Sequence, residues 1–229
     1  MKNSSQILSI AYVVIALAEI YSRYADNEML HLVAKPLLLI VLLAYFHVSL
    51  GGTSNKITKL ITWGLAFSWI GDVLLMFESR DPLFFMGGLG AFLTTHILYI
   101  LAFKASVEDS GKSIFRTRPI AIFPFILIGG FFYYTLFPNL AELRLPVFVY
   151  TGVIVTMVIF ALNRIGSVSI ASFRLVYYGA IVFMMSDLLL AINKFLMPFE
   201  YAGVYIIGTY ILAQGLIVGG VLVENVKGD

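Results

Sequence analysis

Eight long apolar segments follow one another along the chain, and they constrain the fold more than any other feature. They cover residues 6–22, 32–50, 57–77, 83–104, 118–137, 143–162, 173–193 and 201–223. Each is close to the ~20 residues that a helix needs to cross a hydrocarbon core of ~30 Å. Lipid offers no partner for backbone N–H and C=O groups, so such segments cross as helices. The sequence therefore predicts an all-α, polytopic transmembrane helical bundle of about eight helices, forming a single transmembrane domain over residues 1–229.

The amino-acid composition agrees with a lipid environment and excludes several kinds of site. Apolar residues make up 60% of the chain and charged residues 12%, against about 45–50% and about 25% in soluble domains. Cysteine is absent, which excludes disulfides, thiolate metal sites and a cysteine nucleophile. His31, His47 and His96 lack the spacing of a zinc site, and no phosphate-binding glycine loop is present. We therefore expect no metal site, and the net charge of +2 indicates no nucleic-acid partner.

The first apolar segment and the loop charges predict the orientation. Glu19 stands where a signal peptide would prepare its cleavage site, so we expect this segment to remain as a spanning helix. Eight helices place both termini on one side, called side A here, and the opposite face is side B. Side B carries five lysines and arginines, and side A carries ten, namely Lys2, Lys56, Lys59, Lys104, Lys112, Arg116, Arg118, Arg164, Arg174 and Lys227. The positive-inside rule then places side A and both termini in the cytoplasm, and we expect a bacterial plasma membrane.

A short internal similarity favours a four-plus-four parallel repeat. Gly71-Asp72-Val73-Leu74-Leu75 resembles Ser186-Asp187-Leu188-Leu189-Leu190, and the two segments lie four spans apart. Leucine-rich segments also match by chance, so a duplication and a coincidence explain this pair equally well.

Ionisable residues inside the spans are the candidate functional residues, because charge is costly in a membrane and by default marks a site. With a rise of ~1.5 Å per residue, Asp72 lies roughly 8 Å inside side B, Asp187 roughly 9 Å and Lys35 roughly 5 Å. Three different helices thus bring two acids and a lysine to one shallow layer. His96 is expected deeper.

Other polar residues have weaker claims to a functional role. His96 shares a helix face with Gly88, Phe92 and Tyr99, and the glycine would allow close helix packing. A hydrogen-bonded packing role for His96 is equally favoured. Gln214 lies at a similar depth. Glu19, near a helix end, is expected to reach water by snorkelling, and His31 and His47 are expected at the membrane interface.

Two carboxyl groups in one shallow layer suit acid–base chemistry. Desolvation and mutual repulsion disfavour two anions side by side, and Lys35 would hold one acid ionised. The expected result is one protonated acid beside one carboxylate, which provides a general acid and a general base. The alternative interpretation is that Asp72 and Lys35 form a structural ion pair that holds two helices together.

Five motifs together resemble the YhhN family of lysoplasmalogenases. They are Lys35-Pro36, Gly71-Asp72 with the leucines after it, Phe85-x-x-Gly88-x-x-x-Phe92-x-x-x-His96-x-x-Tyr99, Ser186-Asp187, and Tyr210-x-x-Ala213-Gln214. The resemblance implies hydrolysis of the vinyl ether bond of a lysoplasmalogen, a lysophospholipid, without a cofactor. The products would be a fatty aldehyde and glycerophosphoethanolamine or glycerophosphocholine.

The residues fit this chemistry. Protonation of the vinyl ether carbon gives an oxocarbenium ion, to which water adds. Asp72 and Asp187 are the expected catalytic pair, in either order. Lys35 would bind the phosphate or keep one acid ionised. His96 and Gln214 would orient water or a carboxylate, and Tyr99 and Ser186 would support the site.

Two other functions are compatible with acids on spanning helices. An intramembrane aspartyl protease would carry Gly-x-Gly-Asp, whereas residues 70–72 are Ile-Gly-Asp. A proton-coupled transporter would place its acids near the midplane in broken helices, whereas these acids are shallow and neither of their helices contains proline.

Overall fold

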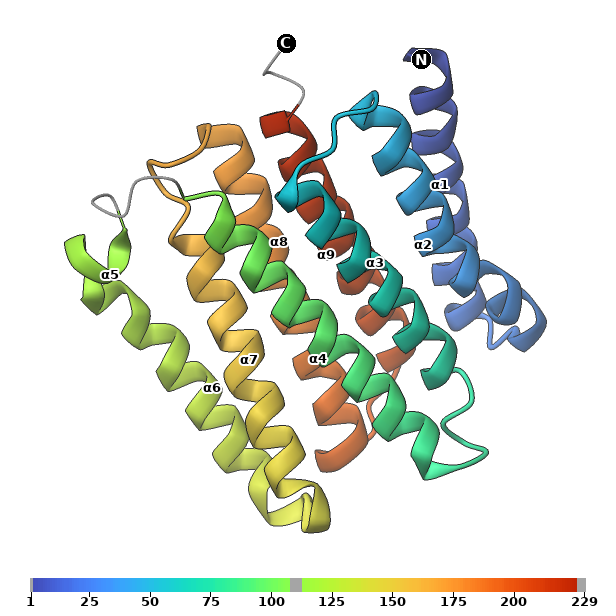
Figure 1. Ribbon diagram of the computed structural model, residues 1–229. Helices are drawn as coiled ribbons and strands as arrows, with labels where there is room; N and C mark the ends of the chain where they lie inside the picture. The colour runs from blue at the N-terminus through green and yellow to red at the C-terminus, as the bar shows by residue number, and fades with distance from the viewer. Residues whose placement is uncertain (1, 108–112, 226–229) are drawn as a thin grey trace. The chain divides into compact units, whose positions relative to one another are not determined.

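The computed structural model describes residues 2–107 and 113–225, and these residues form helices and turns without any strand (Figure 1). Eight long helices correspond to the eight apolar segments, which confirms the predicted fold class. They are α1 (Lys2–Tyr24), α2 (Glu28–Leu50), α3 (Lys56–Leu75), α4 (Pro82–Ala105), α6 (Phe123–Leu136), α7 (Arg144–Leu162), α8 (Ile170–Ala191) and α9 (Ala202–Asn225).

Seven segments of the described chain are long and apolar enough to cross a membrane, so this is an integral, multi-pass membrane protein. The long helix outside that set is α3, which carries Lys56 and Lys59 in its first turn and Asp72 near its end. Its 20 residues extend about 30 Å, which is still a membrane thickness. On α1 the most exposed side chains are apolar, as a lipid-facing helix requires: Ile7, Ile10, Val14 and Leu17 are each 59–65% exposed.

The described chain forms two compact units. Unit 1 contains α1, α2, α3, α4 as far as Ala102, and the end of α9 from Val221. Unit 2 runs from Phe103 to Gly220. The single domain expected over residues 1–229 stays a prediction.

Short, capped turns connect the helices of unit 1. The Asn27 side chain caps α2 by accepting from the Leu30 N–H at 3.1 Å. Gly51 ends α2 with a left-handed φ of 60°, which glycine adopts without steric cost. Asn55 and Thr58 then form a capping box that starts α3. Turns this short make consecutive helices run in opposite directions.

Two hydrogen bonds gather one set of helix ends on side A. Ser5 and Ser49 join the start of α1 to the end of α2, with their Oγ atoms 2.7 Å apart. The Asn55 amide, at the start of α3, donates to Oδ1 of Asn225 at 2.6 Å, at the end of α9. The two ends of the described chain therefore share a side, in agreement with the topology expected for eight spans.

Helices α3 and α4 cross closely at two glycines. A Cβ atom on Gly88 would lie 2.7 Å from Leu75, and one on Gly71 would lie 2.8 Å from the Phe92 ring. Side chains at either position would push the helices apart. The close packing expected at Gly88 is thus confirmed, and it occurs directly beside Asp72.

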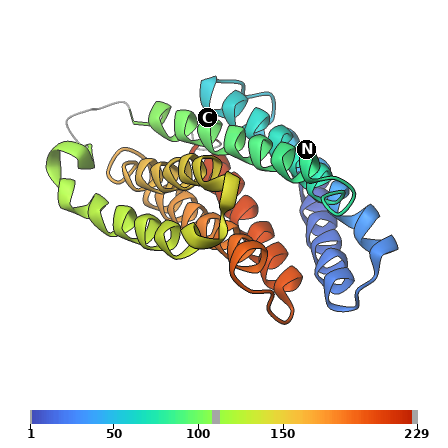
Figure 2. The same ribbon diagram turned by 90° about the horizontal axis from the view of Figure 1, so that it is seen from below.

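Unit 2 is less regular than the sequence predicts. The span expected over 118–137 is divided into the 3-10 turn η2 (Pro119–Ile122) and α6, and the short helix α5 (Ile114–Thr117) precedes it. Proline interrupts the backbone hydrogen-bond pattern at Pro119 and Pro124. Figure 2 shows α6, α7 and α8 running beside one another, and α6–α7 and α7–α8 are in contact. A π turn, η5 (Ile192–Leu196), extends α8.

Arg164 is a buried side chain that links two helices and not an exposed loop cation. Arg164 was predicted among the side-A charges, but it is 2% exposed. Its guanidinium donates to the Ser106 and Ser172 hydroxyls at 2.9 and 2.8 Å, and it lies over the Phe103 ring. It therefore ties the end of α4 to the start of α8. Two other side-A charges, Lys112 and Lys227, lie outside the described residues.

Candidate functional site

Asp72 and Lys35 meet inside unit 1, as the sequence predicts. The Lys35 ammonium nitrogen lies 3.8 Å from Oδ1 of Asp72. The Asp72 side chain is only 4% exposed, whereas that of Lys35 is 14% exposed. The carboxyl is therefore sealed among the helices, and the ammonium belongs to the more exposed side chain of the pair. Tyr12 of α1 also lies within electrostatic reach of Asp72.

The local packing fixes this ion pair in place. The Trp69 indole N–H, one turn before Asp72, donates to the Pro36 carbonyl at 3.1 Å, next to Lys35. Lys35-Pro36 was expected to open the second span, but α2 starts earlier, at Glu28, so the proline lies inside the helix. Trp69 thus links the two helices directly beside the charged side chains.

Asp187 has a neutral partner in unit 2. The Tyr150 hydroxyl of α7 donates to Oδ2 of Asp187 at 2.6 Å. The two residues are 37 positions apart in the sequence, and the same spacing separates Lys35 from Asp72. Each acid is therefore reached by a side chain from the preceding long helix. Because Asp72 and Asp187 belong to different units, their expected pairing stays a prediction.

The other expected supporting residues of unit 2 connect α8 and α9 or stabilise α9. The Ser186 hydroxyl donates to the Ile206 carbonyl at 2.9 Å. The Gln214 side chain is fully buried, and its amide donates to the Tyr210 hydroxyl at 3.4 Å. Both residues hold the helices that carry or adjoin Asp187.

His96 and Tyr99 are fully buried in α4. The Tyr99 ring packs directly against the backbone of Gly64, which indicates a packing role. Thr95, beside His96, donates to the Gly64 carbonyl and accepts from the Ser68 hydroxyl. His96 is thus level with Ser68 and Gly64, one to two helical turns deeper than Asp72. The greater depth expected for His96 agrees with this placement.

The prediction that Glu19 reaches water is wrong. Its side chain is 0% exposed, and its Oε1 lies 2.7 Å from Nδ1 of His31. Ser22 donates to the same carboxyl at 3.2 Å. His31, expected at the interface, is 15% exposed because α1 covers its ring. The prediction failed because the partner of Glu19 comes from another helix, α2. The position of Glu19 along α1 does not reveal that contact.

Sequence reasoning also missed Tyr12 and Tyr150. Tyrosine is common in membrane spans, so neither residue stood out in the sequence. One signal was present for α1, where Tyr12 and Glu19 are seven residues apart and so share a helix face. Tyr150 carries a signal only through its 37-residue spacing to Asp187.

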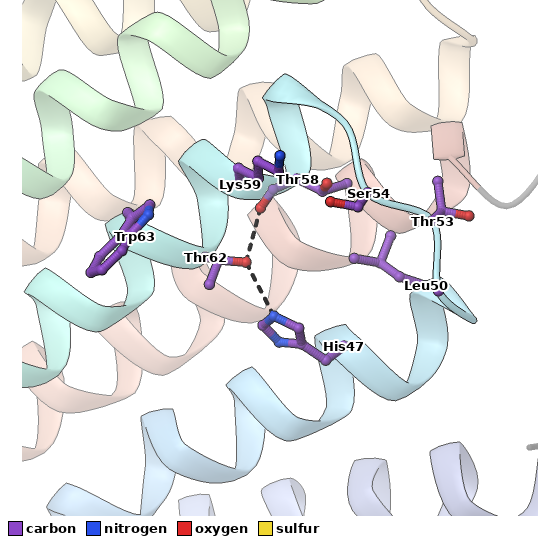
Figure 3. Close-up of a pocket in the computed structure, with 9 residues that line it drawn as sticks. His47, Leu50, Thr53, Ser54, Thr58, Lys59, Thr62 and Trp63 are labelled. Atoms are coloured by element: carbon purple, nitrogen blue, oxygen red, sulfur yellow. Dashed lines mark hydrogen bonds between the residues drawn. The ribbon is translucent and has the colours of Figure 1, made fainter.

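A pocket of about 300 Å³ opens at the other end of unit 1. Figure 3 shows His47, Lys59, Thr62 and Trp63 around it. The Thr62 hydroxyl is hydrogen-bonded to the Thr58 carbonyl and to the His47 ring. None of the expected site residues lines it. Lys59 precedes Asp72 by 13 residues on α3, or about 20 Å. This pocket is therefore separate from the buried Asp72 carboxyl.

Comparison with known proteins gives consistent matches to one family. The sequence model of the YhhN family matches residues 30–221. The chain is 32% identical over 161 residues to the bovine protein named lysoplasmalogenase TMEM86A, covering 67% of this chain and 61% of that protein. It is 30% identical over 165 residues to human lysoplasmalogenase TMEM86B, covering 72% and 64%. The alignments thus span less than two thirds of these relatives. No solved structure matches the chain.

Proposed function

The chain belongs to the YhhN family, and from this premise we propose that it hydrolyses the vinyl ether bond of a lysoplasmalogen. The products are a fatty aldehyde and glycerophosphoethanolamine or glycerophosphocholine. The observation that carries the proposal is the sealed Asp72 carboxyl beside Lys35, in a chain whose relatives are named lysoplasmalogenases. A carboxyl kept from water inside a membrane helix is costly, and catalysis supplies the reason for it.

The partners of the two acids assign their roles in this proposal. Lys35 compensates a negative charge on Asp72, so Asp72 acts as the carboxylate. Tyr150 is a neutral donor to one oxygen of Asp187, which leaves the other oxygen to carry a proton. Asp187 therefore acts as the general acid and Asp72 as the base that stabilises the cation.

The reaction then proceeds in three steps. Asp187 transfers its proton to the β-carbon of the vinyl ether, and the electrons of the double bond form that C–H bond. The resulting oxocarbenium ion is stabilised by the Asp72 carboxylate, which takes a proton as water adds to the cationic carbon. The hemiacetal collapses to the aldehyde as the glycerol oxygen leaves with a proton. That proton comes from Asp72, and the proton of the hemiacetal hydroxyl returns to Asp187, so both acids regain their starting states.

Product analysis tests this function. Purified protein in detergent is given a lysoplasmalogen and, separately, the alkyl ether analogue, which has no double bond to protonate. We expect aldehyde from the vinyl ether alone. A folded preparation that releases no aldehyde contradicts the proposal. Substrate-dependent proton flux in liposomes without product would instead indicate a transporter, and cleavage of a membrane peptide would indicate a protease.

A further inference from the structure

Unit 1 contains a second buried acid to which the proposed reaction gives no role. Glu19 on α1 is fully buried, its carboxyl contacts Nδ1 of His31 at 2.7 Å, and Ser22 donates both to that carboxyl and to the Glu19 carbonyl. Burying a carboxylate in a membrane helix costs free energy even when it is hydrogen-bonded. The Glu19–His31 pair therefore requires an explanation.

His31 and Lys35 lie one helical turn apart on α2, so they share a face. His31 turns toward Glu19 of α1, and Lys35 turns toward Asp72 of α3. The exposures follow one rule: the two basic side chains are 15% and 14% exposed, while their acid partners are 0% and 4% exposed. Unit 1 thus has two neighbouring basic groups that are partly exposed, each in contact with a more deeply buried acid.

We propose that His31 and Lys35 together bind the phosphate of the lysophospholipid, and that Glu19 is a positioning residue that holds the His31 ring. This inference rests on the proposed function and deepens it. Two adjacent nitrogen donors suit the several oxygens of a phosphate group. Glu19 and the phosphate are both acceptors, so the imidazole between them donates from both ring nitrogens.

The depths of the two basic groups fit the shape of the substrate. His31 lies roughly 5 Å and Lys35 roughly 10 Å along α2 from its start at side B. In a lysoplasmalogen the phosphate and the vinyl ether are attached to opposite ends of the glycerol. Because Lys35 lies 3.8 Å from Asp72, a phosphate held by His31 and Lys35 keeps the attached glycerol beside the Asp72 carboxyl, where the proposed reaction needs the vinyl ether.

Unit 2 provides an internal comparison for this assignment. Asp187 follows Asp72 by 115 residues, and Tyr150 follows Lys35 by the same 115 residues. At that offset from Glu19 and His31 stand Tyr134 and Pro146. The second unit thus has an acid and a partner but no counterpart of the Glu19–His31 pair. A packing requirement common to both units does not explain the pair, whereas a single phosphate site does.

The test compares two substrates that differ only in the phosphate-containing head group. One is a lysoplasmalogen, and the other is the matching 1-alkenylglycerol, which has the vinyl ether and no head group. For His31→Gln we expect KM for the lysoplasmalogen to rise on the order of tenfold, as loss of one charge-assisted hydrogen bond predicts. We expect kcat, and KM for the alkenylglycerol, to stay unchanged. Glu19→Gln should raise the same KM by less.

His47→Gln is the matched control, because His47 lies at the other end of the same helix and is exposed. It should leave both KM values unchanged. His31→Arg keeps a cation and should retain most of the affinity if His31→Gln fails to fold. Equal effects of His31→Gln on both substrates, or no effect on either, would overturn the phosphate assignment.

Binding measurements separate this inference from the proposed function. If wild-type protein releases aldehyde from neither substrate, the proposed function fails. The phosphate site is then tested with the uncleavable alkyl ether lysophospholipid against the alkylglycerol. A tenfold weaker binding of the phosphate lipid alone by His31→Gln supports the site, and equal binding by wild type and variant overturns it.

Discussion

Asp72 meets an ammonium group, whereas Asp187 accepts a hydrogen bond from a phenol hydroxyl. The two acids are alike in sequence context, so the difference between their partners is what distinguishes them. In the proposed reaction this difference decides which acid gives a proton and which receives one. It also makes each partner a separate test of the assigned roles.

Tyr150→Phe tests the role of the partner of Asp187. The change removes one hydrogen bond at 2.6 Å and keeps the ring that packs in α7. We expect kcat for aldehyde release to fall on the order of tenfold, because the hydroxyl stabilises the Asp187 carboxylate that forms as its proton leaves, and a hydrogen bond to a charged group contributes about 1.5–3 kcal/mol. Tyr178→Phe on α8, an exposed position, should leave kcat unchanged. A Tyr150→Phe enzyme with normal kcat would contradict the role given to this hydroxyl.

The charged residues of the site were predictable from the sequence, because charge inside a membrane span is costly and therefore rare. Asp72, Asp187 and Lys35 stand out in apolar spans, and the contact between Asp72 and Lys35 follows from their similar depth. Glu19 was misassigned because position along one helix cannot reveal a partner on another. Tyr12 and Tyr150 were missed because a tyrosine in a span has a low cost and many roles.

At the scale of helices, the glycines decide how closely α3 and α4 approach. The existence of all eight long helices was predictable from apolar length, but their ends were not. The ends depend on caps such as Asn27 and Asn55, and the break before α6 depends on prolines. The crossing itself depends on matching small residues on two helices, which the expected role of Gly88 captured.

Gly64→Ala tests this close packing away from the acids. A Cβ at Gly64 would clash with the fully buried Tyr99 ring, and overpacking of this kind costs about 1–3 kcal/mol. We therefore expect a lower thermal unfolding temperature in detergent. Gly90→Ala on α4 is the control, because a Cβ there meets nothing within 4 Å, and it should unfold at or above the wild-type temperature. Equal unfolding temperatures for the two variants would contradict the close crossing.

At the scale of the whole chain, both units repeat a common plan. Beside the acids and their partners, Gly64 and Gly179 are also 115 residues apart, and both are helix glycines at which a Cβ would clash. Gly51 and Gly166, at the same offset, both have a left-handed φ, of 60° and 75°. These matches favour a duplication over a chance similarity of leucine-rich segments. The five-residue match between residues 71–75 and 186–190 alone left duplication and coincidence equally good explanations.

The orientation in the membrane is a prediction at the same scale. Ser54 lies in the turn between α2 and α3, and Ser79 in the turn between α3 and α4, so they mark sides A and B. Because the chain has no cysteine, Ser54→Cys and Ser79→Cys each introduce a unique label site. In intact cells we expect an impermeant thiol reagent to label Ser79→Cys, and Ser54→Cys only after lysis. The reverse pattern would place side A outside.

The most direct test of the central claim is the rate of aldehyde release by Asp72→Asn and Asp187→Asn, measured on a lysoplasmalogen with purified, folded protein. Both changes keep the shape of the side chain and remove its acid–base function. We expect each variant to lose at least about 100-fold in kcat, the lower range for general acid–base catalysis, while its thermal unfolding stays cooperative. Wild-type rates in either variant would contradict the proposal that these two membrane-embedded carboxyls carry out the reaction.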